Sequence, residues 1–149
     1  KTRKIFKSDK LEFFLPDTAS KLELPLVQTG LSAGFPSPAE DYIEERLDLN
    51  QVLIRDKSAT FFGRVNGNSM INAGVFDGDL LVIDKSLEPK NNSILVCVID
   101  GEFTVKKLGK KGGKYYLMPE NDDFEPVEIS SFSDFRIWGV VTYSIKKHY

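Results

Sequence analysis

From residue 50 onward, short apolar runs alternate with turn residues, which is the pattern of a domain built from short β-strands. Strands are predicted over residues 61–65, 80–83, 94–99, 102–108, 115–118, 127–129 and 135–145. The pair Asp100-Gly101 between two of these runs is typical of a two-residue hairpin turn, and residues 109–114 are predicted to form the next turn. We therefore expect a compact, mostly β domain of about 100 residues.

The first 36 residues follow a different pattern. Their apolar clusters are short and are separated by proline and glycine, as in residues 13–16 and 24–27. Such clusters do not make a domain, so we expect an extended N-terminal arm that docks on another surface. Ser37, Pro38 and Glu40 then have the spacing of a capping box with proline in the first turn. One short helix is predicted at about residues 38–48.

Composition and charge exclude several classes of protein. Twenty Lys and Arg stand against 22 Asp and Glu, and the net charge of −2 argues against a protein that coats DNA through a strongly basic surface. A single cysteine excludes an internal disulfide framework, and Cys97 is predicted as a buried structural thiol within an apolar strand. No apolar run approaches the ~20 residues of a membrane helix, and no secretory signal pattern begins the chain. We expect a soluble intracellular protein without a membrane partner.

The chain is poor in ordinary catalytic residues. Its one histidine, His148, stands next to the C-terminus and is a poor candidate for a Ser-His-Asp triad. No paired His, Cys or carboxylate spacing indicates a metal, and the glycines fit neither a Walker A loop nor a dinucleotide fingerprint. We therefore expect neither a metal nor a cofactor.

One serine and two lysines remain as candidates. Ser69 follows a predicted strand in the turn Gly67–Met70, where it is either a nucleophile beside converging backbone N–H groups or a turn serine that bonds local backbone. Without histidine, the base of a serine nucleophile is a lysine whose pKa must fall from about 10.4 to ~7. This shift corresponds to roughly 4 kcal/mol and requires burial of the lysine against apolar side chains. Lys106 and Lys107 point to opposite faces of one predicted strand, so alternation leaves the choice open, and either fits a solvated strand lysine.

Three motifs together resemble those of a known family. Residues 67–70, 77–80 and 100–108 occur in the order found in the self-cleaving Ser-Lys peptidases of the LexA/UmuD family, and the resemblance covers roughly residues 24–145. The family pattern implies that Ser69 is the nucleophile and that Lys106, the first of the Lys-Lys pair, is its base. It also implies that the backbone N–H groups of Asn68 and Ser69 hold the oxyanion, and that the fold is the family's largely antiparallel β domain.

Family members cut their own chain upstream of the peptidase domain, often at an Ala-Gly bond. Ala33-Gly34 occupies such a place here, and two small residues allow the backbone to approach Ser69 closely. The resemblance implies an N-terminal arm over residues 1–33 that self-cleavage removes. Residues 34–50 then form a linker with the short helix, and residues 51–149 form the peptidase domain.

Within the family, residues 34–39 and 48–51 are similar to the stretch that follows the cut in UmuD-like proteins. This implies cleavage stimulated by the RecA filament on single-stranded DNA. It also implies a homodimeric product that serves a UmuC-like, Y-family translesion polymerase in SOS mutagenesis, in the bacterial cytoplasm. The removed arm is basic, so the product is expected to bind nucleic acid weakly on its own.

Three alternatives remain open. The chain could be the C-terminal self-cleavage domain of a LexA-like or phage-like repressor. It could be a signal peptidase, which also uses Ser-Lys chemistry. It could also be a catalytically silent binding module of the same fold.

Overall fold

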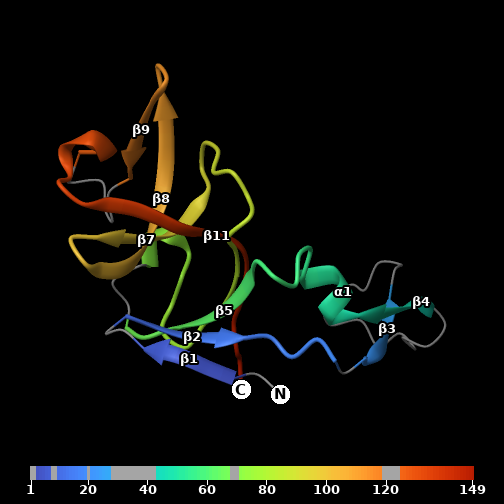
Figure 1. Ribbon diagram of the computed structural model, residues 1–149. Coiled ribbons are helices and arrows are strands. Elements are labelled where there is room, and N and C mark those ends of the chain that lie inside the picture. The colour runs from blue at the N-terminus through green and yellow to red at the C-terminus, as the bar shows by residue number, and fades with distance from the viewer. Residues whose placement is uncertain (1–2, 8–9, 20, 28–42, 68–70, 119–124) are drawn as a thin grey trace.

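The computed structural model describes residues 3–7, 10–19, 21–27, 43–67, 71–118 and 125–149. Their strands form a nine-stranded sheet and a two-stranded sheet, and neighbouring strands are antiparallel throughout (Figure 1). In spatial order the larger sheet contains β1 (Arg3–Lys7), β2 (Leu11–Leu15), β5 (Thr60–Val65), β6 (Leu80–Asp84), β11 (Phe135–Ile145), β7 (Ile94–Ile99), β8 (Glu102–Lys111), β9 (Lys114–Leu117) and β10 (Val127–Glu128). The mostly β fold predicted from the sequence is confirmed.

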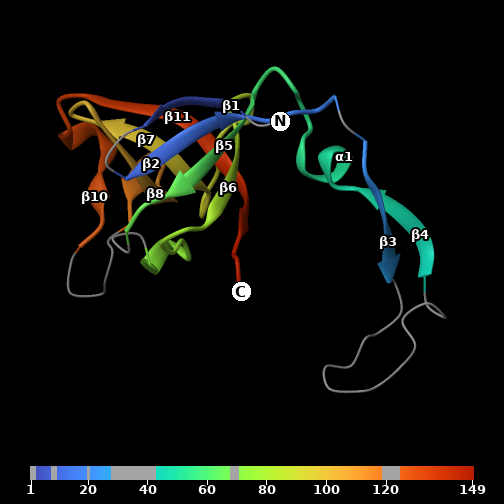
Figure 2. The ribbon, with the colours of Figure 1, turned by 90° about the horizontal axis from the view of Figure 1, so that it is seen from below.

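The smaller sheet lies to one side of the larger one. It pairs β3 (Glu23–Val27) with β4 (Ile43–Asp48), and the short helix α1 (Leu49–Leu53) follows directly. Figures 1 and 2 both show these three elements beside the body of the larger sheet rather than stacked on it. Two single-turn 3₁₀ helices, η2 (Ile71–Ala73) and η3 (Ile129–Ser131), complete the described elements.

The larger sheet curls because its two longest strands each pair with different partners along their length. β11 pairs with β7 through its first half and with β6 through its second half, while β8 pairs first with β7 and then with β9. The curl brings β2 against β8, although four strands separate them in the sheet. The rings of Phe13 and Phe103 lie 5.0 Å apart between centroids.

An aromatic cluster fills the inside of this curl. The Trp138 ring of β11 lies 4.7 Å from Phe13, 5.0 Å from Phe61 and 6.1 Å from Phe103, measured between centroids. Around these rings a buried apolar core joins strands β2, β5, β6, β7 and β8; its members are Leu11, Phe13, Val65, Val75, Leu81, Ile83, Val96 and Val105. Each tilted aromatic contact adds about 0.5–1.5 kcal/mol to the burial of these side chains.

The hairpin between β7 and β8 is confirmed at Asp100-Gly101. Both residues have positive φ, 50° and 85°, as this two-residue turn requires. The next turn is shorter than the predicted 109–114. β8 continues to Lys111, and only Gly112 and Gly113, with φ of 61° and 78°, form the turn. Pairing with β9 extends β8 beyond what its own sequence pattern indicated.

The helix predicted at about residues 38–48 is wrong over its described part. Residues 43–48 form β4 instead, and residues 38–42 lie outside the described residues. The helix begins only after Asp48, whose carboxylate accepts a hydrogen bond from the Asn50 N–H at 3.1 Å. β3 supplies β4 with backbone hydrogen bonds, and this tertiary pairing outweighs the local capping signals.

The N-terminal segment contributes two strands to the larger sheet. β1 and β2 form a hairpin, and β2 then pairs with β5. Leu11 and Phe13 of β2 are fully buried, so this part of the expected arm belongs to the core. The boundary expected at residue 33 lies outside the described residues.

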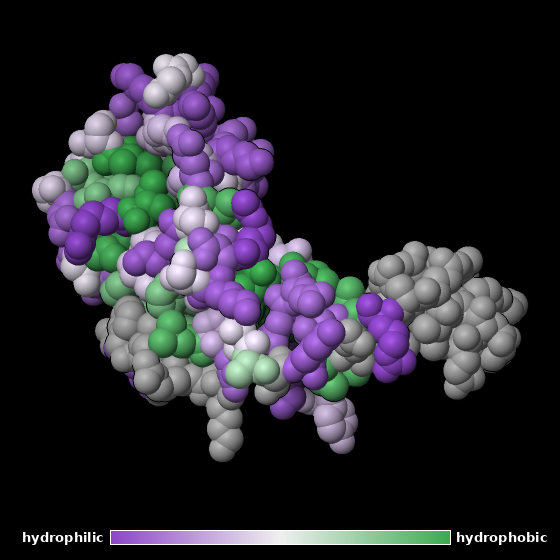
Figure 3. Space-filling view, turned by 45° about the vertical axis from the view of Figure 1, so that its right-hand side comes forward, coloured by the Kyte–Doolittle hydropathy of each residue, from purple (hydrophilic) through white to green (hydrophobic). Residues whose placement is uncertain are grey.

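Several large apolar side chains remain at the surface. They are Leu22, Leu24, Leu49, Val52, Ile71, Val127, Ile137, Tyr143, Ile145 and Tyr149. On the face shown in Figure 3, hydrophobic patches interrupt the hydrophilic surface. Single exposed apolar residues are common in soluble proteins, but Ile137, Tyr143 and Ile145 all follow one strand, β11.

We predict that Gly139→Ala destabilises the fold by about 1–3 kcal/mol. A Cβ at Gly139 would lie 2.6 Å from Cγ2 of Ile83 and 3.5 Å from the Asp84 carbonyl oxygen, and neither atom can move freely. Gly109→Ala is the matched control because the one atom that its Cβ would meet too closely is Sδ of Met118, in a flexible side chain, at 2.7 Å, while the Tyr116 carbonyl oxygen lies at an ordinary contact distance of 3.8 Å. Urea unfolding followed by circular dichroism measures both, and equal losses would contradict the packing argument.

Candidate active site

The structure distinguishes Lys106 from Lys107 by their burial, which strand alternation could not do. Lys106 is half-buried in the middle of β8, whereas Lys107 is exposed. Lys106 lies opposite Leu95 of β7, and directly opposite residues of antiparallel strands point to the same face. On β8 the same face carries Thr104 and Leu108, and these two residues and Leu95 are all buried. Lys106 therefore stands on an apolar face, which is the environment that a lysine base needs.

Thr104 is a polar residue of this face that the sequence analysis missed. Its side chain is buried, and its hydroxyl oxygen has no hydrogen-bond partner among the described residues. A buried hydroxyl without a partner is costly, by about 1–3 kcal/mol, so Thr104 is a candidate for contact with a group that approaches Lys106. Its place two residues before Lys106, on the same strand face, was the signal in the sequence that could have identified it.

The segment that carries the predicted nucleophile is held at both of its flanks. Residues 68–70, which include Asn68 and Ser69, lie outside the described residues. On one side, the Gly67 N–H donates a hydrogen bond to the Asp77 carboxylate at 2.7 Å. On the other side, η2 contacts β8, the strand that carries Lys106. The structure thus places residues 71–73, which follow the undescribed segment, against the strand that carries Lys106.

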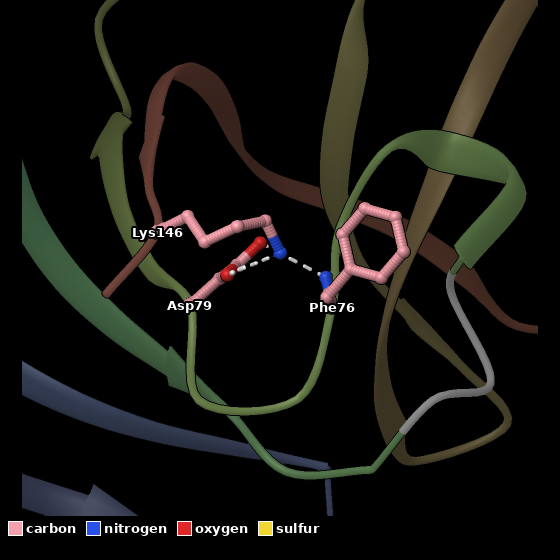
Figure 4. A network of polar contacts seen from close by, with 3 residues as sticks. All are labelled: Phe76, Asp79 and Lys146. Atoms are coloured by element: carbon pink, nitrogen blue, oxygen red, sulfur yellow. Dashed lines mark hydrogen bonds and ion pairs between the residues drawn. The ribbon is translucent and has the colours of Figure 1, made fainter. Parts of the chain in front are cut away.

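The turn that carries Asp77 is itself anchored by a buried carboxylate. Asp79 is almost fully buried, accepts the Phe76 N–H at 2.9 Å, and forms an ion pair with Nζ of Lys146 at 3.4 Å (Figure 4). The same Nζ lies 3.8 Å from the centre of the Phe76 ring, within cation–π range. Backbone bonds between Val65 and this turn join it to the end of β5. Lys146, near the C-terminus, therefore stabilises the turn of residues 76–79, and Asp77 of this turn binds the Gly67 N–H.

Cys97 is buried on β7, directly opposite Thr104 of β8, and its burial agrees with the sequence prediction. Its Sγ donates toward the Thr104 carbonyl oxygen at 3.7 Å. Burial raises the pKa of the Cys97 thiol to about 12, while the positive charges of Lys106 and Lys10 lower it less strongly. The thiol is therefore neutral at physiological pH and is not a nucleophile.

Comparison with known families shows which family this chain resembles. The model of the peptidase S24-like family matches residues 25–142, which is most of the chain. The chain belongs to the peptidase S24-like family. The relationship to LexA- and UmuD-type self-cleaving peptidases that the three sequence motifs indicated is confirmed.

Individual relatives match the S24-like chain over much of its length. Protein MucA of Salmonella typhimurium is 42% identical over 141 residues, covering 93% of this chain and 96% of MucA. Protein ImpA of Shigella flexneri is 44% identical over 131 residues and covers 83% of each chain. The LexA repressor of Glaesserella parasuis is 41% identical over 106 residues, which are 71% of this chain and 50% of the repressor.

The remaining predicted site residues are not placed by the structure. Ala33 and Gly34, like Ser69 and Asn68, lie outside the described residues, so only Lys106 of the predicted constellation is positioned. Within the described part of the chain, no group of three or more His, Cys, Asp or Glu residues could hold a metal ion. In the same part of the chain, no helix is both long and apolar enough to cross a membrane.

We predict that Asp79→Ala lowers the free energy of unfolding by about 3 kcal/mol, because the partly buried Phe76 N–H and the Lys146 ammonium both lose their acceptor. Asp77→Ala removes an exposed carboxylate from the same turn and should cost about 1 kcal/mol or less. Urea unfolding of both variants gives the comparison. A loss for Asp77→Ala as large as that for Asp79→Ala would show that the buried carboxylate is not the main anchor.

We predict that Cys97 in the folded protein does not react with a thiol reagent at pH 8, whereas the urea-unfolded chain reacts fully. Because the folded pKa lies above the unfolded value of about 8.5, the thiol stabilises the fold fully below that pH. This stabilisation is lost between about pH 8.5 and 12, by up to ~1.4 kcal/mol per pH unit. Reagent absorbance measures the reaction, and fast labelling of the native protein would contradict this burial.

Proposed function

We propose that this S24-like protein cuts its own Ala33–Gly34 bond, with Ser69 as the nucleophile and Lys106 as the general base. The observation that supports this assignment is the half-buried position of Lys106 on an apolar face of β8, the strand that residues 71–73 contact. Lys107 lies on the same strand, but its side chain is exposed and points to the opposite face.

The proposed reaction proceeds through an acyl-enzyme. The neutral amine of Lys106 takes the hydroxyl proton of Ser69, and the Ser69 oxygen attacks the carbonyl carbon of Ala33. Backbone N–H groups of Asn68 and Ser69 hold the oxyanion. Lys106 then returns its proton to the nitrogen of Gly34, and the peptide bond breaks. Water, activated by the same lysine, hydrolyses the ester between Ala33 and Ser69.

The chemistry requires a neutral lysine amine at the moment of attack. Model lysine side chains titrate near pH 10.4, so alkaline solution raises the neutral fraction. At neutral pH the same effect comes from removing water, which happens when the segment around Ala33 covers the apolar face that carries Lys106. The unpartnered hydroxyl of Thr104 lies on that face and is available to accept a hydrogen bond from the amine or to bind the incoming segment. A partner that stabilises the covered state switches the reaction on.

The relatives support a role in SOS mutagenesis. The match to MucA covers 93% of this chain, whereas the match to the LexA repressor covers 71% of it. This favours an UmuD-like protein over the self-cleavage domain of a repressor. We propose that the RecA filament on single-stranded DNA stimulates the cut, and that the product serves a UmuC-like, Y-family translesion polymerase in the bacterial cytoplasm.

A second copy of the chain is the further partner that we propose. The apolar side chains of Ile137, Tyr143 and Ile145 are exposed along β11, and burial of such a row stabilises a symmetric dimer.

We predict that the purified chain cuts itself at pH ~10 without a partner, and at neutral pH when RecA, ATP and single-stranded DNA are added. The 149-residue chain should lose 33 residues and leave a product of 116. Ser69→Ala and Lys106→Ala should abolish both reactions, because each removes one partner of the proton transfer. Lys107→Ala is the matched control and should cut within about twofold of the natural chain, since general acid-base groups contribute 10²–10⁴-fold and an exposed neighbour does not.

Intact mass spectrometry measures these outcomes. Circular dichroism of the sample at pH ~10 checks that the protein is still folded. This control is needed because ionisation of the buried Cys97 thiol destabilises the fold at high pH. Loss of cutting in Lys107→Ala with activity retained in Lys106→Ala would overturn the assignment of the base. An intact natural chain under both conditions would leave a binding module of the same fold.

A further inference from the structure

The bond proposed for cleavage lies in the connection between two paired strands. β3 ends at Val27 and β4 begins at Ile43, and the two strands pair antiparallel from Glu23–Asp48 to Val27–Ile43. Ala33 and Gly34 fall between them in the sequence. A cut there separates the chain into a piece with β1, β2 and β3 and a piece with all later elements, yet it breaks none of the described strand pairs.

The first piece is joined to the second by a strand inside the larger sheet. β2 pairs with β5 in the register Leu11–Val65 to Phe14–Phe62. The Asn66 N–H extends this ladder by donating to the Lys10 carbonyl oxygen at 2.8 Å. These backbone bonds do not depend on the connection through residues 28–42.

Side chains add an apolar anchor to the backbone pairing. Leu11 and Phe13 are fully buried and belong to the same core cluster as Val65 of β5. The Phe13 ring lies 5.0 Å from Phe103 and 4.7 Å from Trp138, both of which belong to the other piece. Alternate residues of β2 thus fill the core, as an added strand does in recognition by β-augmentation. Figure 2 shows β2 alongside β5 at this edge of the sheet.

We propose that the edge of β5 is a strand-binding groove that retains residues 1–33 after the chain is cut, so that the first product is a complex of two pieces. The groove recognises an extended segment with apolar side chains at two alternate positions, supplied here by Leu11 and Phe13. This inference rests on the proposed function only for the position of the cut.

The cut then leaves β2 bound in the groove, but it makes this binding depend on the protein concentration. In the intact chain, β2 is tethered and has a high effective concentration, so a competing strand cannot displace it readily. In the cut chain, β2 binds as a separate molecule, so dilution or a competing extended segment removes it. Removal uncovers the β5 edge and the site of the Phe13 ring beside Trp138.

The test uses the full chain with Ser69→Ala and a recognition site for an added endopeptidase inserted between Ala33 and Gly34. After the added enzyme has cut the chain, both pieces should elute together in size-exclusion chromatography at micromolar concentration and separate only in urea. Elution of the small piece alone, while the large piece keeps its circular dichroism, would overturn the proposal. Because the added enzyme makes the cut, failure of self-cleavage does not affect this result.

Phe13→Ala in the same background should weaken retention of the small piece by about 100-fold or more, since it removes a buried ring. Phe14→Ala is the matched control because its side chain is on the opposite face of β2, beneath Arg64, and it should change retention only a few-fold. Fluorescence anisotropy of a labelled small piece on dilution measures both. Equal effects of the two variants would contradict the groove.

A competition experiment covers the case in which Phe13→Ala prevents folding. In this experiment the chain keeps Phe13 and is cut by the added enzyme, so that the labelled small piece is bound to the large piece. An excess of a synthetic peptide of residues 1–19 is then added. The natural peptide should displace the label, and the peptide with Phe13→Ala should not do so at the same concentration. Equal displacement by both peptides would overturn the apolar anchor as the basis of retention.

Discussion

The packing of three phenylalanine rings around Trp138 holds the larger sheet in its curled form. These rings come from β2, β5 and β8, and Trp138 comes from β11, so one cluster joins strands from the start, middle and end of the chain. It also sets the direction of the side chains on β8. Because Phe103 and Val105 face this core, Thr104 and Lys106 must face the other way. The position of the proposed base is therefore a consequence of core packing.

A second apolar cluster makes the Lys106 face of β8 hydrophobic. Leu95, Leu108 and Val140 are buried together there, with Leu87, Tyr115 and Ile129 packed around them. Lys106 stands opposite Leu95 and two residues before Leu108, so it lies on the same strand face as two members of this cluster. The aliphatic stem of a lysine can be buried while the amine reaches a polar group, which is the arrangement that Ser-Lys chemistry needs. An apolar face also favours burial of the segment that we propose is cut.

The loop that leads to Ser69 depends on contacts from distant parts of the chain. Asp77 holds Gly67 across the loop, and Asp79 in the same turn is paired with Lys146 near the C-terminus. The N-terminal segment, through β2, completes the core on which this loop is built. The S24-like fold thus joins both ends of the chain to the site, and a cut in the β3–β4 connection leaves these contacts in place.

The sequence by itself determined the strands from residue 60 onward, the Asp100-Gly101 hairpin and the family motifs, because each rests on residues close together in the chain. Alternation along β8 could show that Lys106 and Lys107 face opposite ways, but it could not show which face is buried. That depended on β7, on the core cluster and on the curl of the sheet. Local signals were wrong where they competed with pairing, as when residues 43–48 joined β3 as a strand instead of continuing a capped helix.

The place of β2 in the core and the pairing of Asp79 with Lys146 were likewise decided only by the tertiary structure. Short segments do not carry information about partners that lie tens of residues away. In this protein those distant partners supply the burial that distinguishes one lysine from its neighbour.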